Sequence, residues 1–165
     1  MELNLLPILN FDGRKIDISE DISLTLSDGD NFQLTAPVHF DGTATNVGGT
    51  IEIKGRATAN AVLVCDRCLE SFDSSIEFEI DEAFKKEDEF SGDDENPDIS
   101  TFVGTTIDLV EIVYANLFMN LPSKFLCRDD CEGLCPVCGK NLNQGDCDCS
   151  AENTDPRFDI LDKLL

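Results

Sequence analysis

The segment Cys127–Cys149, which reads CRDDCEGLCPVCGKNLNQGDCDC, decides how this chain folds, because it holds six of the eight cysteines. The other two, Cys65 and Cys68, form an isolated C-x-x-C pair far upstream. No cysteine stands alone, so the eight thiols suggest two metal sites with four ligands each. The rest of the chain is expected to act as the scaffold that brings the upstream pair to the cysteine-rich segment.

The spacing of the cysteines indicates how they divide between two sites. Cys135 and Cys138 form a knuckle, and the glycine after it lets backbone amides turn toward a thiolate. Cys147 and Cys149 complete a local set if the backbone turns at Asp148. We favour this set because short loops close at a lower entropic cost. It leaves a long-range set of Cys65, Cys68, Cys127 and Cys131. The alternative joins the two C-x-x-C pairs, as in rubredoxin-like sites.

Length and composition favour one globular core with a metal-held appendage. The chain has 165 residues, of which 41% are hydrophobic. Its N-terminus has no basic leader, and the first apolar run stops at Asn10, which predicts neither a signal peptide nor a membrane span. We therefore expect a cytoplasmic protein. Thiols stay reduced in that compartment, which favours metal ligands over disulfides.

The charge of the chain points to a basic partner. Twelve basic residues stand against 34 acidic ones, for a net charge of −22. Nucleic-acid affinity comes mostly from Lys and Arg that neutralise phosphates, so tight binding to naked RNA or DNA is disfavoured. Lys124, Arg128 and Lys140 could touch phosphates, but residues 124–149 are still net negative. A basic protein fits this field better, and the alternative is that the acidity only confers solubility.

Hydrophobic alternation predicts an α+β fold, mainly an antiparallel β-meander with one or two packed helices. The alternating runs are residues 15–19, 32–40, 51–54, 57–64 and 72–84, and the first 30 residues also allow a helical turn. The Cys65–Cys68 pair falls at the tip between the last two strands. Asp66 and Arg67, between the two cysteines, are expected to mark an exposed turn.

One helix is predicted after the strands. Thr106 or Asp108 can cap it, and Leu121-Pro122 ends it after about Asn120. Its apolar stripe, expected to pack on the sheet, consists of Ile107, Val110, Val113, Tyr114, Leu117 and Phe118. An acidic mobile loop is expected at about 85–100, within a linker-like stretch that starts at Glu82.

These elements suggest two parts. Residues 1–126 form the β domain with its helix, and residues 127–165 form a cysteine-rich zinc module with a C-terminal helix, packed on the first part as one unit.

Known enzyme signatures fit the sequence poorly. A thioredoxin-like site lacks its flanking Trp, since the chain has none, and a nucleobase deaminase would need H-x-E where His39 stands in His-Phe-Asp. His39 is the only histidine and is expected to be an exposed or hydrogen-bonded sheet residue. Four-cysteine sites usually hold structural zinc, or iron, and leave no open position for a substrate. We therefore expect no enzymatic activity.

Several motifs resemble those of the YceD family of bacteria and plastids. They are Val64–Leu69, Ile107–Leu109, Leu121-Pro122, Cys127–Asn143 and Asp155–Phe158. The resemblance covers roughly residues 50–165 and implies a role in the accumulation or processing of large-subunit (23S) ribosomal RNA, with no established enzymatic activity. We therefore expect a non-enzymatic ribosome biogenesis factor that acts through a basic ribosomal protein or an assembly intermediate. The alternatives are a metal-dependent or redox enzyme acting on RNA, and a generic zinc-stabilised interaction module.

Overall fold

The computed structural model describes residues 1–26, 32–87 and 99–149, and these form two compact units. Unit 1 contains Met1–Leu63 and Phe72–Ser123, and unit 2 contains Val64–Ser71 and the chain from Lys124 onward. Unit 2 therefore includes the Cys65–Cys68 turn as well as the cysteine-rich segment. The predicted C-terminal helix and the Asp155–Phe158 motif lie outside the described residues, and the packing of the two predicted parts as one unit remains a prediction.

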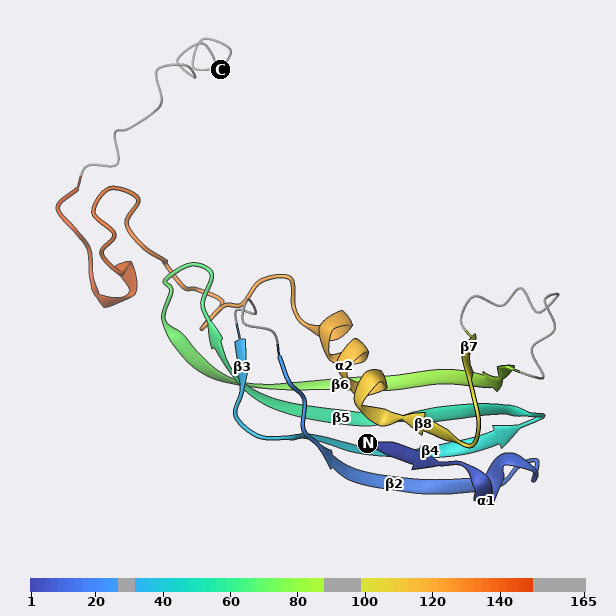
Figure 1. Cartoon of the computed structure of the whole chain (residues 1–165). Coiled ribbons are helices and arrows are strands. Elements are labelled where there is room, and N and C mark those ends of the chain that lie inside the picture. Colours follow the sequence, from blue (N-terminus) through green and yellow to red (C-terminus); the bar gives the residue numbers. More distant parts are fainter. Residues whose placement is uncertain (27–31, 88–98, 150–165) are drawn as a thin grey trace, which may run out of the picture. The chain divides into compact units, whose positions relative to one another are not determined.

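Unit 1 is built on a six-stranded sheet in which β2, β4, β5, β6 and β7 follow one another, while β3 also pairs with β5 (Figure 1). The strands are β2 (Lys15–Ile22), β3 (Phe32–Leu34), β4 (Val38–Val47), β5 (Thr50–Val64), β6 (Ser71–Lys86) and β7 (Ile99–Phe102). A second sheet pairs β1 (Glu2–Asn4) with β8 (Thr106–Asp108), and the α-helices of the described residues are α1 (Leu6–Leu9) and α2 (Leu109–Asn120). The predicted α+β fold with a mainly antiparallel sheet is confirmed.

The centre of the sheet is a long hairpin of β4 and β5. The runs predicted at 51–54 and 57–64 are one strand, because Gly55 continues it opposite Gly42 of β4. A Cβ atom on Gly55 would lie 2.4 Å from the carbonyl oxygen of Asp41 and 2.6 Å from the Cα of Gly42. This contact requires glycine, since any larger residue would push the two backbones apart.

The run predicted over residues 32–40 is broken into β3 and β4. Both strands pair with β5, but Phe32 lies opposite Leu63 and His39 lies opposite Thr58. The Thr35 amide still donates to the Asn60 carbonyl oxygen of β5 at 2.9 Å, so the register shifts after it, before β4 begins at Val38, as in a β-bulge. His39 is exposed, and its Nδ1 lies 2.8 Å from an Asp21 carboxylate oxygen, so it is the hydrogen-bonded sheet residue expected.

The acidic linker is shorter than predicted. Glu82–Lys86 continue β6, and Phe84 in this part is buried. Residues 83–86 pair with β7, which runs parallel to β6 and also takes up residues 99 and 100 of the predicted loop. The prediction was wrong at both ends because the acidic composition hides a strand pairing between distant residues. Residues 88–98 lie outside the described part of the chain.

Helix α2 has the predicted extent and cap. The Asp108 carboxylate accepts a hydrogen bond from the Val110 amide at 2.9 Å, and the helix ends at Asn120. Its buried residues are Leu109, Ile112, Val113 and Leu117. The predicted stripe was wrong in part, since Val110, Tyr114 and Phe118 are only half-buried. Apolar residues surround most of this helix, so periodicity alone does not fix the buried face.

Within the described ranges, no helix has both the length and the apolar character needed to cross a membrane.

Candidate metal centres

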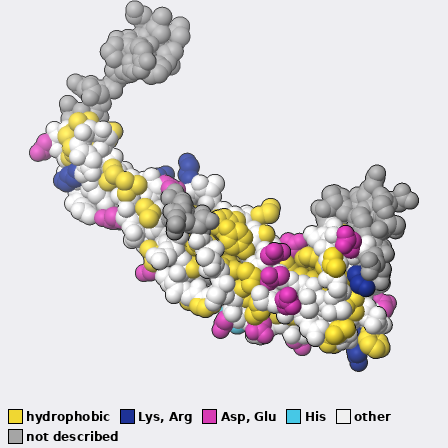
Figure 2. Space-filling model, viewed as in Figure 1, with side chains coloured by type: hydrophobic (Ala, Val, Ile, Leu, Met, Phe, Trp, Pro, Cys, Tyr) yellow, Lys and Arg dark blue, Asp and Glu magenta, His cyan; other side chains and the backbone are white. Residues whose placement is uncertain are grey.

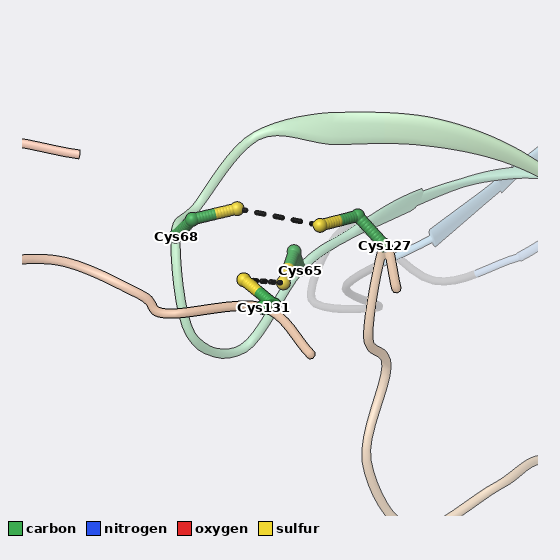
Figure 3. A group of neighbouring side chains, drawn as sticks. All are labelled: Cys65, Cys68, Cys127 and Cys131. Carbon is green, nitrogen blue, oxygen red and sulfur yellow. Dashed lines mark hydrogen bonds between the residues drawn. The ribbon is translucent and has the colours of Figure 1, made fainter. Parts of the chain in front are cut away.

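The first cysteine cluster joins the β5–β6 turn to the segment that follows α2. The turn is tight, because the Leu69 amide donates to the Cys65 carbonyl oxygen and the Cys65 amide donates to Glu70, both at 2.9 Å. The Cys65 and Cys131 sulfur atoms are 3.8 Å apart, and those of Cys68 and Cys127 are 3.7 Å apart (Figure 3). The long-range set of four thiols favoured from spacing is thus the set that the structure brings together.

The two residues inside the first C-x-x-C hold the incoming segment. The Asp66 amide donates to the Phe125 carbonyl oxygen at 2.8 Å, and the Phe125 amide donates back to the Asp66 carboxylate at 2.7 Å. The Arg67 guanidinium donates to the Cys131 carbonyl oxygen at 2.8 Å, and the Leu134 amide donates to the Arg67 carbonyl oxygen at 3.1 Å. Both side chains are exposed as expected, but they also align the two halves of the cluster.

The spacing of the sulfur atoms fits a tetrahedral ion. All four ligand atoms lie within 4.8 Å of one another. With zinc–sulfur bonds of about 2.3 Å, tetrahedral geometry places sulfur atoms about 3.8 Å apart. The separations of 3.8 and 3.7 Å match this value. All eight cysteines are free thiols, so none is consumed in a disulfide.

The second cluster is formed by Cys135, Cys138, Cys147 and Cys149, whose sulfur atoms also lie within 4.8 Å of one another. The Val137 amide points at the Cys135 sulfur at 3.4 Å, and Gly139 follows with a φ of 73°. The chain bends at Asp148, as the C-x-C spacing requires. Both clusters can therefore hold a metal ion with four thiolates.

The two clusters differ in exposure. Cys65, Cys68 and Cys131 of the first are at most 3% exposed. In the second cluster only Cys135 is buried, and Cys138 is exposed. Water and chelators therefore reach the second cluster more easily than the first.

The thiols within each cluster oppose one another's ionisation. Burial raises the pKa of Cys65, but backbone amides from Cys127, Cys68 and Arg67 outweigh it and lower that pKa to about 6. Burial and hydrogen bonding to Cys68 raise the pKa of Cys127 to about 12. In the second cluster, backbone amides of Cys138 and Val137 lower the pKa of Cys135 to about 6, while Cys138 raises that of Cys149 to about 12. Four adjacent thiolates need a cation to balance their charge.

Asn143 has a role that the sequence does not reveal. It lies in a 3-10 turn, η2 (Leu142–Gln144), and its side-chain amide donates to the Cys131 sulfur at 3.3 Å. Asn141 supports it, because the Asn141 side-chain oxygen accepts from the Asn143 backbone and side chain. The side-chain nitrogen of Asn141 is itself buried without a hydrogen-bond partner, for which we have no physical account. Only the position of both residues between Cys138 and Cys147 hints at a structural role.

Two of the three cations considered for phosphate contact are engaged within unit 2. Arg128 donates to the Asn143 side chain and pairs with Asp130 at 3.4 Å. The Lys140 ammonium donates to the Asp146 carbonyl oxygen. These contacts stabilise the cysteine-rich segment itself.

Unit 1 contains an acidic cleft of about 470 Å³. Glu82 of β6, Asp108 of β8 and Glu111 of α2 line it, together with apolar side chains that include Phe102 and Ile112. Acidic side chains also far outnumber basic ones on the face drawn in Figure 2. A cleft that combines carboxylates with apolar side chains suits a basic, partly apolar segment.

Comparison with known proteins finds mycobacterial relatives of this chain. The chain is similar to an uncharacterized protein of Mycobacterium tuberculosis and one of Mycobacterium bovis, each 29% identical over 131 residues, which cover 79% of this chain and 63% of the relative. An uncharacterized protein of Mycobacterium leprae is 29% identical over 108 residues, or 65% of this chain and 50% of the relative. The chain thus spans less than two thirds of the length of these relatives.

No solved structure matches the chain. The family model described as large ribosomal RNA subunit accumulation protein YceD matches residues 53–165, a range that contains all eight cysteines. The chain belongs to the YceD family.

Proposed function

We propose that this protein is a non-enzymatic ribosome biogenesis factor that promotes the accumulation or processing of large-subunit (23S) ribosomal RNA. The observation that carries this proposal is the family match over residues 53–165, whose description is large ribosomal RNA subunit accumulation. The two four-thiol clusters within that range agree with it, because a set of four cysteine ligands leaves no open coordination position for a substrate.

Zinc is the proposed occupant of both clusters. Cys65, Cys68, Cys127 and Cys131 would hold one ion, and Cys135, Cys138, Cys147 and Cys149 would hold the other. All-thiolate tetrahedral sites select zinc or iron, and zinc is the usual structural occupant. At the first cluster the ion would fasten the β5–β6 turn to the segment after α2, and that fastening is its proposed contribution.

The proposed partner is a basic ribosomal protein or an assembly intermediate that presents one. A net charge of −22 repels phosphate backbones and attracts basic segments. The cleft lined by Glu82, Asp108 and Glu111 offers the carboxylates of Glu82 and Glu111 to such a segment, whereas that of Asp108 pairs with the N-terminal ammonium at 2.9 Å. Arg128 and Lys140 do not oppose this assignment, since both are engaged by neighbours within unit 2. The effect on ribosomal RNA is therefore proposed to be indirect.

A deletion strain tests the cellular role. Loss of the gene is expected to lower mature 23S ribosomal RNA relative to 16S, and the wild-type gene is expected to restore the ratio. A variant with Cys65→Ser and Cys131→Ser is expected to restore it poorly, because the first cluster loses half of its ligands. An unchanged ribosomal RNA profile in the deletion strain would leave a generic interaction module as the better description.

Affinity purification tests the partner. The full chain is expected to retain a basic ribosomal protein at moderate salt and to release it as salt screens the charges. Recovery of naked RNA alone, with binding that persists at high salt, contradicts the partner assignment. A metal-dependent turnover that Cys135→Ser abolishes without unfolding the chain contradicts the non-enzymatic assignment, since structural zinc predicts unfolding of the module on chelation.

A further inference from the structure

We propose that the turn η2 couples metal loading of the two clusters, with Asn143 as the positioning residue. The proposal rests on the zinc sites proposed above and adds that they do not fill independently. Residues of η2 belong to the loop between Cys138 and Cys147 of the second cluster, yet their side chains hold parts of the first.

The side chain of Asn143 uses its full hydrogen-bonding capacity. Its nitrogen donates to the Cys131 sulfur at 3.3 Å and to the Asn141 side-chain oxygen at 2.8 Å. Its oxygen accepts from the Glu132 amide at 2.8 Å and from the Arg128 guanidinium. An amide side chain offers two donor and two acceptor positions, and all four are occupied. The orientation that presents a donor to Cys131 is therefore fixed.

A second contact from η2 reaches the other half of the first cluster. Gln144 donates from its side-chain nitrogen to the Glu70 carboxylate at 2.9 Å. Glu70 lies two residues after Cys68 and accepts the Cys65 amide through its carbonyl oxygen. The turn thus contacts both chain segments that supply ligands to the first cluster.

The position of η2 depends on the loop that the second cluster closes. The Leu142 amide donates to the Gly133 carbonyl oxygen at 2.9 Å, and the Cys135 amide donates to the Lys140 carbonyl oxygen at 2.8 Å. A bridge between Leu134 and Asn141 and a bond from the Lys140 ammonium to the Asp146 carbonyl oxygen add to these contacts, and the two ends of the loop supply the second set of thiols. A metal ion bound by that set fixes both ends of the loop, and with them the place of Asn143.

This arrangement predicts that filling the second cluster strengthens metal binding at the first. A hydrogen bond to a coordinating sulfur orients the ligand, and loss of such a supporting contact lowers metal affinity about 10- to 100-fold. When the second cluster is empty, Asn143 is released and the first cluster loses this support. Metal binding at the more exposed second cluster therefore raises the metal affinity of the buried first cluster.

The test measures zinc occupancy of each cluster separately in the full chain. Free zinc is set with a chelator buffer, and protection of each cysteine from alkylation is mapped by peptide mass spectrometry. Disabling the second cluster with Cys138→Ser and Cys149→Ser is expected to lower first-cluster affinity about tenfold. Asn143→Asp places an acceptor where Cys131 and Asn141 need a donor, so it is expected to lower first-cluster affinity to a similar extent.

Combining these substitutions distinguishes coupling between the clusters from independent losses of first-cluster affinity. In the Asn143→Asp background, disabling the second cluster is expected to change first-cluster affinity little further, because the connection is already lost. Asn10→Asp, which adds the same charge at an exposed residue of unit 1, is the matched control and leaves both affinities unchanged. Additive losses in the combined variant overturn the proposal.

Gln144→Ala keeps the proposal testable if Asn143→Asp fails to fold. Gln144 is exposed, and its loss removes only the bond to Glu70, so first-cluster affinity is expected to fall roughly threefold. If the chain binds two ions but neither Gln144→Ala nor an empty second cluster changes first-cluster affinity, the coupling alone is overturned. A wild-type chain that binds no zinc overturns the zinc sites and the coupling together.

Discussion

Gly139 and Leu69 occupy equivalent positions directly after the two C-x-x-C knuckles. Gly139→Ala and Leu69→Gly should therefore change metal affinity in opposite directions. Both have left-handed backbones, with φ of 73° at Gly139 and 60° at Leu69. Each donates its amide to the carbonyl oxygen of the first cysteine in its knuckle at 2.9 Å. The chain tolerates an ordinary side chain in this strained conformation at the first cluster and has glycine at the second.

The size of the expected change in metal affinity follows from the backbone conformation and from the space around each residue. A Cβ atom on Gly139 meets no heavy atom within 4 Å, so Gly139→Ala introduces conformational strain without a clash. Left-handed geometry costs a non-glycine residue about 1–2 kcal/mol, and the smaller freedom of alanine in the unfolded chain offsets about 0.5–1 kcal/mol. The net loss is about 1 kcal/mol, which corresponds to a roughly fivefold weaker second site. Leu69→Gly reverses the sign and should strengthen the first site roughly fivefold.

Chelator competition on the full chain, with alkylation mapping to assign each site, measures both changes. The expected pattern is a weaker second site in Gly139→Ala and a stronger first site in Leu69→Gly. Metal affinity is the right readout because metal binding and folding of a small thiolate site share one free energy. Equal affinities in Gly139→Ala and wild type, or a weaker first site in Leu69→Gly, would refute the reasoning from backbone strain.

Three further predictions follow from the site and the cleft. Zinc loading at pH 8 should release protons, because the Cys127 and Cys149 thiols, whose pKa is raised to about 12, are protonated at that pH. Zinc affinity should therefore fall as the pH decreases. Calorimetry in two buffers of different ionisation enthalpy measures the number of protons released. Glu82→Gln with Glu111→Gln should weaken retention of a basic partner in co-purification and leave zinc content unchanged, whereas unchanged retention would exclude the cleft as the docking surface. Asp108→Ala should destabilise unit 1 by about 1 kcal/mol through loss of the α2 cap and of the ion pair with the N-terminal ammonium, seen as a lower thermal midpoint, and an unchanged midpoint would show that neither contact contributes.

Local patterns in the sequence predict much of this protein. The α2 cap at Asp108 and the tip position of the Cys65–Cys68 pair each depend on residues close together in the chain. The buried face of β6, with Ile76, Phe78 and Ile80, follows from alternation alone. Loop closure favours the observed division of the eight thiols, since the second set spans a short segment.

Features that depend on distant partners escape the sequence. The parallel pairing of β7 with residues 83–86 turns part of an acidic linker into a strand, and no local signal marks it. The break at Thr35–Pro37 is visible only in the register against β5. Asn143 resembles any polar loop residue until its contact with Cys131 is known. In each case the feature depends on a contact with a residue that is not a neighbour in the sequence.

Native mass spectrometry with metal analysis of the purified full chain tests the central claim most directly. Two four-thiol clusters predict a mass shift of two zinc ions per chain under native conditions and none after acid denaturation. Replacing Cys65 or Cys138 with serine should each reduce the stoichiometry by one ion. A metal-free chain with eight reactive thiols, or a wild-type chain that binds a single ion, would contradict the claim.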